Sequence, residues 1–141
     1  MNFLVNLDVD DLDAAIAFYV AAFGLDVGRR LGPTVAELLG GPAPIYLLEK
    51  LAGTPASEHA AQPRTYQRHW TPVHLDVVVK DIDSAVRQAV AAGAQLEAAV
   101  TVHAWGKLAL MADPFGHGFC FVQFSAQGYD AIVDQGGAET A

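Results

Sequence analysis

The stretch VNLDVDDLDAAIAFY, at residues 5–19, is matched further along by VHLDVVVKDIDSAV at residues 73–86. Each copy begins as an alternating apolar run, typical of a half-buried strand, and continues into apolar residues at helical spacing. Asp11 and Asp81 are suited to begin the two helices, because an aspartate side chain accepts hydrogen bonds from the unpaired amides of a first helical turn. The repeat predicts two strand–helix units in tandem.

Glycines at the end of each helical pattern, Gly24 and Gly93, are expected to stop the helices. The segments after them are strand-like and divided by turns, and Asp113-Pro114-Phe115-Gly116 predicts a hairpin before the last strand. Each half therefore reads β-α-β-β-β. We expect strands near residues 3–9, 26–31, 35–39, 45–49, 73–79, 95–102, 107–111 and 118–124.

A rival α+β arrangement is β-α-β-β-α-β, the ferredoxin-like order. It would place the second helix one strand pair earlier than Asp81, and the three strand-like runs between Gly24 and Lys50 argue against it. We therefore expect a single domain over residues 1–141. It divides into module 1 (1–51), a polar linker (52–69), module 2 (70–124) and a C-terminal tail (125–141).

The charge and the apolar pattern of the chain disfavour two classes of partner, nucleic acids and membranes. The formal net charge is −8 with only eight Lys and Arg residues, which disfavours binding to a nucleic-acid backbone. No apolar run approaches the roughly 18 residues of a membrane span, so no membrane partner is expected. The single cysteine, Cys120, excludes an internal disulfide and fits a reducing compartment. We expect a cytoplasmic protein.

The tandem modules resemble the vicinal oxygen chelate superfamily, which includes glyoxalase I, extradiol dioxygenases and bleomycin-resistance proteins. The resemblance rests on VDDLDAAIAFYVAAFGL (9–25), VVVKDIDSAV (77–86) and MADPFGHGFCFVQF (111–124). It implies an α+β fold in which the tandem βαβββ modules form a cup-shaped, eight-stranded mixed sheet around one pocket. It also implies a homodimer, and a small molecule as the binding partner.

In metal-dependent members, a His and a Glu from each module hold a divalent ion. Carried over to this chain, those positions are Leu4, Leu47, His74 and Cys120. Leucine is no ligand, and ions such as Zn²⁺ normally take at least three protein ligands. We therefore expect no metal in the pocket. The alternative is a divalent ion held by His74 and Glu49, which shares a strand face with Leu47, and with Cys120 as a soft third ligand.

Strand alternation from these positions predicts the pocket lining. The predicted lining is Leu4, Asn6, Asp8, Ile45, Leu47, Glu49, His74, Asp76, Val78, Cys120, Val122 and Phe124. The residues expected to bind the substrate are Asn6, Leu47, Glu49, His74, Asp76, Trp105 and Cys120. No catalytic residue is assigned.

Several of these residues have a structural alternative. His74 suits a general base in a pocket, but a lone strand histidine is also commonly a satisfied structural group. Trp105 either stacks on a planar ligand at the pocket mouth or simply packs. Asp8 and Asp76 lie near strand ends, where solvent or backbone amides satisfy them. Cys120 is flanked by phenylalanines, which favours an inert buried thiol over a nucleophile.

Two function classes remain open on the sequence. The first is a glyoxalase/bleomycin-resistance-like protein whose metal-free pocket between the modules binds an unidentified small molecule. The alternative is a divalent-metal-dependent glyoxalase-like lyase, isomerase or dioxygenase that uses His74 and Glu49. Metal-independent acid–base chemistry by His74 with Glu49 or Asp76 is a third hypothesis.

Overall fold

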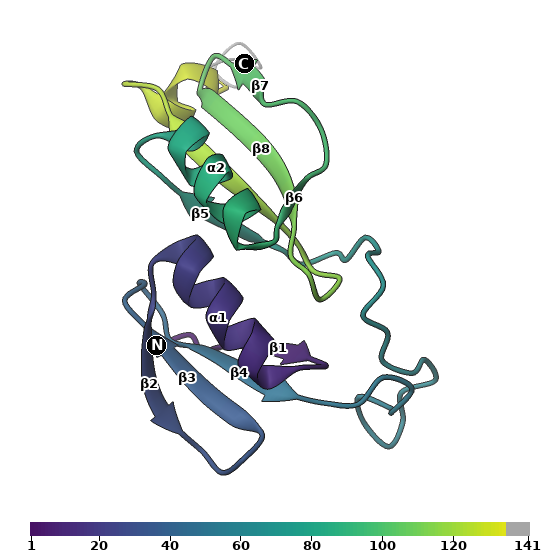
Figure 1. Ribbon diagram of the computed structural model, residues 1–141. Helices are drawn as coiled ribbons and strands as arrows, with labels where there is room; N and C mark the ends of the chain where they lie inside the picture. The colour runs from purple at the N-terminus through teal and green to yellow at the C-terminus, as the bar shows by residue number, and fades with distance from the viewer. Residues whose placement is uncertain (135–141) are drawn as a thin grey trace.

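The computed structural model describes residues 1–134, and their strands and two α-helices fall into two modules, β-α-β-β-β and β-α-β-β-β-β (Figure 1). Module 1 consists of β1 (Val5–Val9), α1 (Leu12–Phe23), β2 (Asp26–Arg30), β3 (Val35–Leu39) and β4 (Ile45–Glu49). Module 2 consists of β5 (Leu75–Val78), α2 (Ile82–Ala92), β6 (Gln95–Leu96), β7 (Thr101–His103), β8 (Gly106–Ala112) and β9 (Gly118–Phe124). A short 3₁₀ turn, η1 (Gly128–Ile132), follows. The predicted α+β class and the tandem modules are confirmed.

The strands form two sheets, with the order β1-β4-β3-β2 in module 1 and β5-β9-β8-β6 in module 2. The first strand of each module pairs in parallel with the last, and the other pairs are antiparallel. The expected single eight-stranded sheet is therefore not formed within residues 1–134. The run expected at 95–102 is divided, because β6 pairs with one end of β8 and β7 with the other.

The helix ends match the sequence prediction. The Asp11 and Asp81 side chains each accept from the amide three residues on, at 3.0 and 3.1 Å. Gly24 and Gly93 follow the helices with φ angles of 66° and 118°, in the region that glycine enters without steric cost. The local sequence therefore determines where both helices begin and end.

One apolar core joins the two modules. Both helices cover the same side of their sheets and pack against each other (Figure 1). Phe23 of α1 contacts Phe119 and Phe121 of β9 edge to face, with ring centroids 5.2 and 6.1 Å apart. Such aromatic pairs contribute beyond the area that they bury. The modules are thus held together by their helix-covered sides.

Polar contacts add to this core. The Tyr19 hydroxyl of α1 donates to the buried Asp113 carboxylate, which also accepts from two amides of the β8–β9 turn. In the same turn, His117 Nε2 lies 2.7 Å from the backbone oxygen of Asp8 in β1. Because buried polar groups are costly when unpaired, these bonds fix the relative placement of the modules.

The linker packs closely against the β8–β9 turn. A Cβ atom on Gly116 would lie 2.5 Å from the carbonyl oxygen of Tyr66, and one on Gly118 would lie 2.4 Å from the guanidinium of Arg68. Position 116 thus requires glycine for the linker backbone to pass, whereas a side chain at Gly118 would displace the Arg68 guanidinium. No helix among residues 1–134 is long and apolar enough to cross a membrane.

Candidate functional site

Each sheet has one face covered by its helix and an opposite face, called here the open face. On β4, Leu47 is fully buried in the core beneath α1. Glu49 points the same way, and its carboxylate accepts from the Leu12 amide at 2.8 Å, at the start of α1. The expected pocket positions of Leu47 and Glu49 are therefore wrong, because alternation along the strand turns both side chains to the helix side.

Gln123 has the same role in module 2. Its side-chain oxygen accepts from the Ile82 amide at 2.8 Å, at the start of α2. Glu49 and Gln123 are thus equivalent, and the residues three positions earlier are Tyr46 and Cys120. Aligning these two acceptors at the ends of the last strands would have placed Tyr46, rather than Leu47, on the open face from sequence alone.

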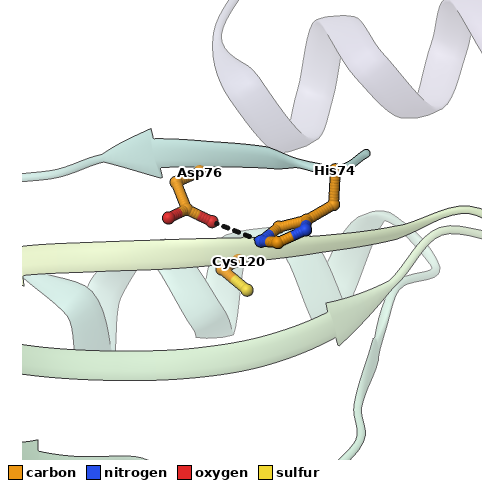
Figure 2. Close-up of side chains that lie close together, drawn as sticks. All are labelled: His74, Asp76 and Cys120. Atoms are coloured by element: carbon orange, nitrogen blue, oxygen red, sulfur yellow. Dashed lines mark ion pairs between the residues drawn. The ribbon is translucent and has the colours of Figure 1, made fainter. Parts of the chain in front are cut away.

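Three predicted site residues come together on the open face of module 2 (Figure 2). His74 directly precedes β5, Asp76 lies two residues on, and Cys120 is opposite Asp76 in the parallel β5–β9 pairing. One ligand-type atom from each lies within 4.8 Å of the others, and His74 Nε2 is 3.3 Å from Asp76 Oδ1. The cluster is accessible, since 49% of the His74 side chain and 43% of the Asp76 side chain are exposed.

The Cys120 thiol is buried at the base of this cluster. Burial raises its pKa, and the adjacent Asp76 carboxylate adds to the shift by its charge and by accepting a hydrogen bond from the thiol, so that the pKa lies at about 11. A thiol with a raised pKa is protonated near neutral pH, and the thiolate is the nucleophilic form. In the free protein Cys120 is therefore not an activated nucleophile.

A cavity of about 390 Å³ lies between the modules. Its wall contains Asn6 from β1, His74 from the start of β5, and Tyr19 and Phe23 from α1. His117 also contributes, but its Nε2 is engaged by the Asp8 backbone. First-strand residues of both modules thus meet at one cavity.

A smaller cavity of about 110 Å³ adjoins the cluster. His74 and Cys120 form part of its wall, and it is closed by Arg68 at the end of the linker and by Trp70 and Thr71 at the start of module 2. Arg68 is held by Glu97, with Nε and Oε1 2.5 Å apart. His74 therefore lines both cavities, as do Thr71, Gly118 and Phe119.

The open face of module 1 holds an ion pair that the sequence analysis missed. Arg29 donates to both carboxylate oxygens of the almost fully buried Glu37, at 3.0 and 2.6 Å, and the Tyr46 hydroxyl donates to the same group. Hydrogen bonds from Arg29 and Tyr46 lower the Glu37 pKa to about 2. A single acid within the apolar run VAELL (35–39) was the available signal.

Leu4 and Asn6 lie beside this network. Both line a groove of about 340 Å³ with Tyr46 and Leu48. Trp105 lies instead at the other end of the module 2 open face, near Phe124, where its ring stacks on His103 with centroids 4.8 Å apart. The structure thus gives the indole ring partners within the chain and does not bring it to the His74 cluster.

The family model described as "Glyoxalase-like domain" matches residues 4–122. Among curated relatives, an uncharacterised protein of Mycobacterium bovis is 32% identical over 116 residues, which cover 79% of this chain and 76% of that protein. An uncharacterised protein of Mycobacterium tuberculosis shows the same identity over 79% of this chain and 68% of its own length. The match extends across both modules.

Solved structures with 16–24% identity share the fold. A glyoxalase-related enzyme from Fulvimarina pelagi gives a TM-score of 0.68 at 20% identity, covering 91% of this chain and 94% of its own. TioX from Micromonospora gives 0.67 at 24% identity (89% and 99% covered). The fosfomycin resistance protein FosX from Listeria monocytogenes gives 0.67 at 16% identity (90% and 93% covered). At these identities the likeness describes the fold alone.

Proposed function

The chain belongs to the glyoxalase-like domain family of the vicinal oxygen chelate superfamily, and we propose that it binds a small organic molecule in the cavity between its modules. The observation that carries the proposal is that Asn6 and His74, one from the start of each module, line the same cavity of about 390 Å³. Small-molecule sites are typically concave, largely apolar and supplied with a few convergent polar groups.

The polar groups in this cavity differ in what they can offer a ligand. Tyr19 donates its hydroxyl proton to Asp113, and His117 is bound to the Asp8 backbone. Asn6 is exposed, and its side chain makes no hydrogen bond within the part of the chain that the structure describes. The His74 side chain is half exposed. Asn6 and His74 are therefore the groups that orient the ligand, and apolar side chains such as Phe23 pack against it.

Binding in this cavity requires no ion that bridges the modules. The resemblance assigns ligands to two positions in each module, and the positions in module 1 are Leu4 and, with the register corrected, Tyr46. Leucine offers no donor atom, and the Tyr46 hydroxyl is already bonded to Glu37 and Arg29. The module 1 half of a bridging donor set is therefore missing, so the ligand itself spans the two modules.

The test is a thermal-unfolding screen of small organic molecules. A compound at 100 times its Kd stabilises a folded protein by about 2.7 kcal/mol, which raises Tm by several degrees for a chain of this size. We expect His74→Ala to abolish the stabilisation, whereas His59→Ala, which alters an exposed linker histidine, should retain it. A hit that stabilises both variants equally would reject the site.

A second candidate is a glyoxalase-like lyase, isomerase or dioxygenase that depends on a divalent ion. The observation that favours it is the cluster of His74, Asp76 and Cys120, which supplies the donors that Glu49 does not. Product analysis with glyoxalase and dioxygenase substrates, with and without added ions, tests it. Turnover that needs an ion and is lost in His74→Ala would make this the function.

Homodimerisation is a further prediction from the family. Apolar side chains are exposed on both open faces, including Leu4 and Leu31 in module 1 and Val78 and Leu110 in module 2. A second copy would cover such surface. Sedimentation at micromolar concentration should give twice the chain mass, and a mass of about 15 kDa would refute it.

A further inference from the structure

We propose that His74, Asp76 and Cys120 form a binding site for a thiophilic divalent ion, Zn²⁺ or Co²⁺, contained within module 2. This inference does not depend on the small molecule proposed above. It also differs from the His and Glu set that the resemblance implies, because Asp76 and a thiol take part and module 1 contributes nothing.

The backbone brings the three donors to one place. His74 and Asp76 are two residues apart at the start of β5, so both side chains lie on the open face. Cys120 is the direct partner of Asp76 in the β5–β9 pairing. Side chains on extended, paired strands are held with little freedom, which suits a site that must be formed before the ion arrives.

The spacing of the donor atoms fits a small tetrahedral ion after a small adjustment. Zinc bonds of about 2.0–2.3 Å place tetrahedral donors roughly 3.3–3.8 Å apart. His74 Nε2 and Asp76 Oδ1 are already 3.3 Å apart, and all three donor atoms lie within 4.8 Å of one another. A shift of about 1 Å or less closes the remaining distances, and the half-exposed His74 and Asp76 side chains have room to make it.

The donor types determine which ion is preferred. A thiolate, an imidazole and one carboxylate suit Zn²⁺ and Co²⁺, whereas Mg²⁺ and Ca²⁺ require oxygen ligands at six or more positions. On binding, the Cys120 proton leaves to solvent and the thiolate sulfur bonds to the ion. The small cavity beside the cluster, lined by Arg68 and Thr71, would leave room for a water or a ligand atom as the fourth ligand.

Cobalt absorption tests the site directly. Cys120 is the only cysteine of the chain, so a thiolate-to-Co²⁺ charge-transfer band in the near ultraviolet can come from no other residue. We expect chelator-stripped, reduced full-length protein to develop this band with one Co²⁺ per chain, together with the strong visible bands of tetrahedral cobalt. Zn²⁺ should displace the cobalt, and excess Mg²⁺ should not.

Variants separate the three donors. Cys120→Ser should lose the near-ultraviolet band. His74→Ala and Asp76→Asn should each weaken Co²⁺ binding by more than about tenfold, because loss of a residue that merely hydrogen-bonds to a metal ligand already costs that much. His59→Ala is the matched control and should titrate like the wild type. Circular dichroism confirms that each variant is folded.

Cobalt that binds wild-type protein without a charge-transfer band would overturn the site, and so would no binding at all. Half an ion per chain would also contradict it, because the ion would then join two copies. The wild-type spectrum decides the matter even if every variant fails to fold. No organic ligand is used, so failure here leaves the small-molecule proposal standing, and a failed screen leaves this one standing.

Discussion

The two modules are alike on the side that faces their helices and different on the open side. In both, an aspartate begins the helix, and an acceptor from the last strand, Glu49 or Gln123, binds the first helical amide. On the open faces, equivalent positions hold Tyr46 in module 1 and Cys120 in module 2. The side chains on the helix side form the shared core, and those on the open side include the ion pair and the metal-ligand type residues.

This difference explains why the repeated sequence does not give repeated function. The fold requires a packed core and capped helices in each copy, so both copies keep them. It places no such requirement on the open face. Module 1 therefore carries an ion pair between the exposed Arg29 and the buried Glu37, while module 2 carries an accessible donor cluster around His74.

The largest expected effect on stability comes from truncating a side chain in the core, compared with one on the open face. Leu47→Ala should destabilise the protein by about 2–5 kcal/mol, because it leaves a cavity beneath α1. Leu48→Ala, one residue on and on the open face, should cost clearly less because its side chain is only partly buried. Urea unfolding measures both, and equal costs would contradict the register.

The helix acceptors should give a smaller effect. Glu49→Ala removes the partner of the first α1 amide and should cost about 1–2 kcal/mol, as loss of a helix cap does. Glu49→Gln keeps an acceptor oxygen, as Gln123 does in module 2, and should cost a few tenths. Unfolding midpoints compare the pair. If Glu49→Gln weakened ligand binding without changing stability, Glu49 would line the pocket after all, and its assignment to the helix side would be wrong.

The ion pair of module 1 predicts that the stability of the protein falls at acidic pH. The Glu37 pKa is lowered from 4.5 to about 2 by Arg29 and Tyr46, so its contribution is complete above pH 4.5 and is lost as the pH falls toward 2. Glu37→Gln should flatten the decline of Tm over that window. Glu58→Gln, an exposed linker acid, is the control and should follow the wild type.

The thiol of module 2 predicts the smallest effect, one on reactivity rather than stability. Alkylation of Cys120 in folded, metal-free protein should show a midpoint near pH 11. Burial is the main cause and the Asp76 carboxylate the second, so Asp76→Asn should lower the midpoint. A midpoint at the ordinary thiol value near 9 would show that Cys120 is not desolvated as described.

Local sequence signals predicted the fold because each acts over a few residues. Asp11, Gly24 and their counterparts in module 2 fix the helices through contacts with neighbouring backbone. Strand face is harder, because a shift of one residue reverses every side chain. That shift misplaced Leu47 and Glu49, whereas the parallel pairing of β5 with β9 brings Asp76 and Cys120 together, as the predicted lining of the pocket requires.

Long-range contacts account for what the sequence could not predict. Besides its neighbour His103, the ring partners of Trp105 come from β9 and η1, and Arg68 reaches Glu97 across twenty-nine positions. Nothing local to those residues specifies such partners. The closing of the small cavity by the linker follows from these contacts, so it is a property of the tertiary structure.

The central claim is that the ligand lies between the modules, and the most direct test combines Asn6→Ala and His74→Ala with a compound from the screen. Isothermal titration should show each substitution weakening binding by roughly 5- to 30-fold, the equivalent of a hydrogen bond worth about 1–2 kcal/mol. The double variant should be weaker than either single variant. Unchanged affinity in Asn6→Ala, with loss in His74→Ala, would place the ligand on module 2 alone and contradict the account.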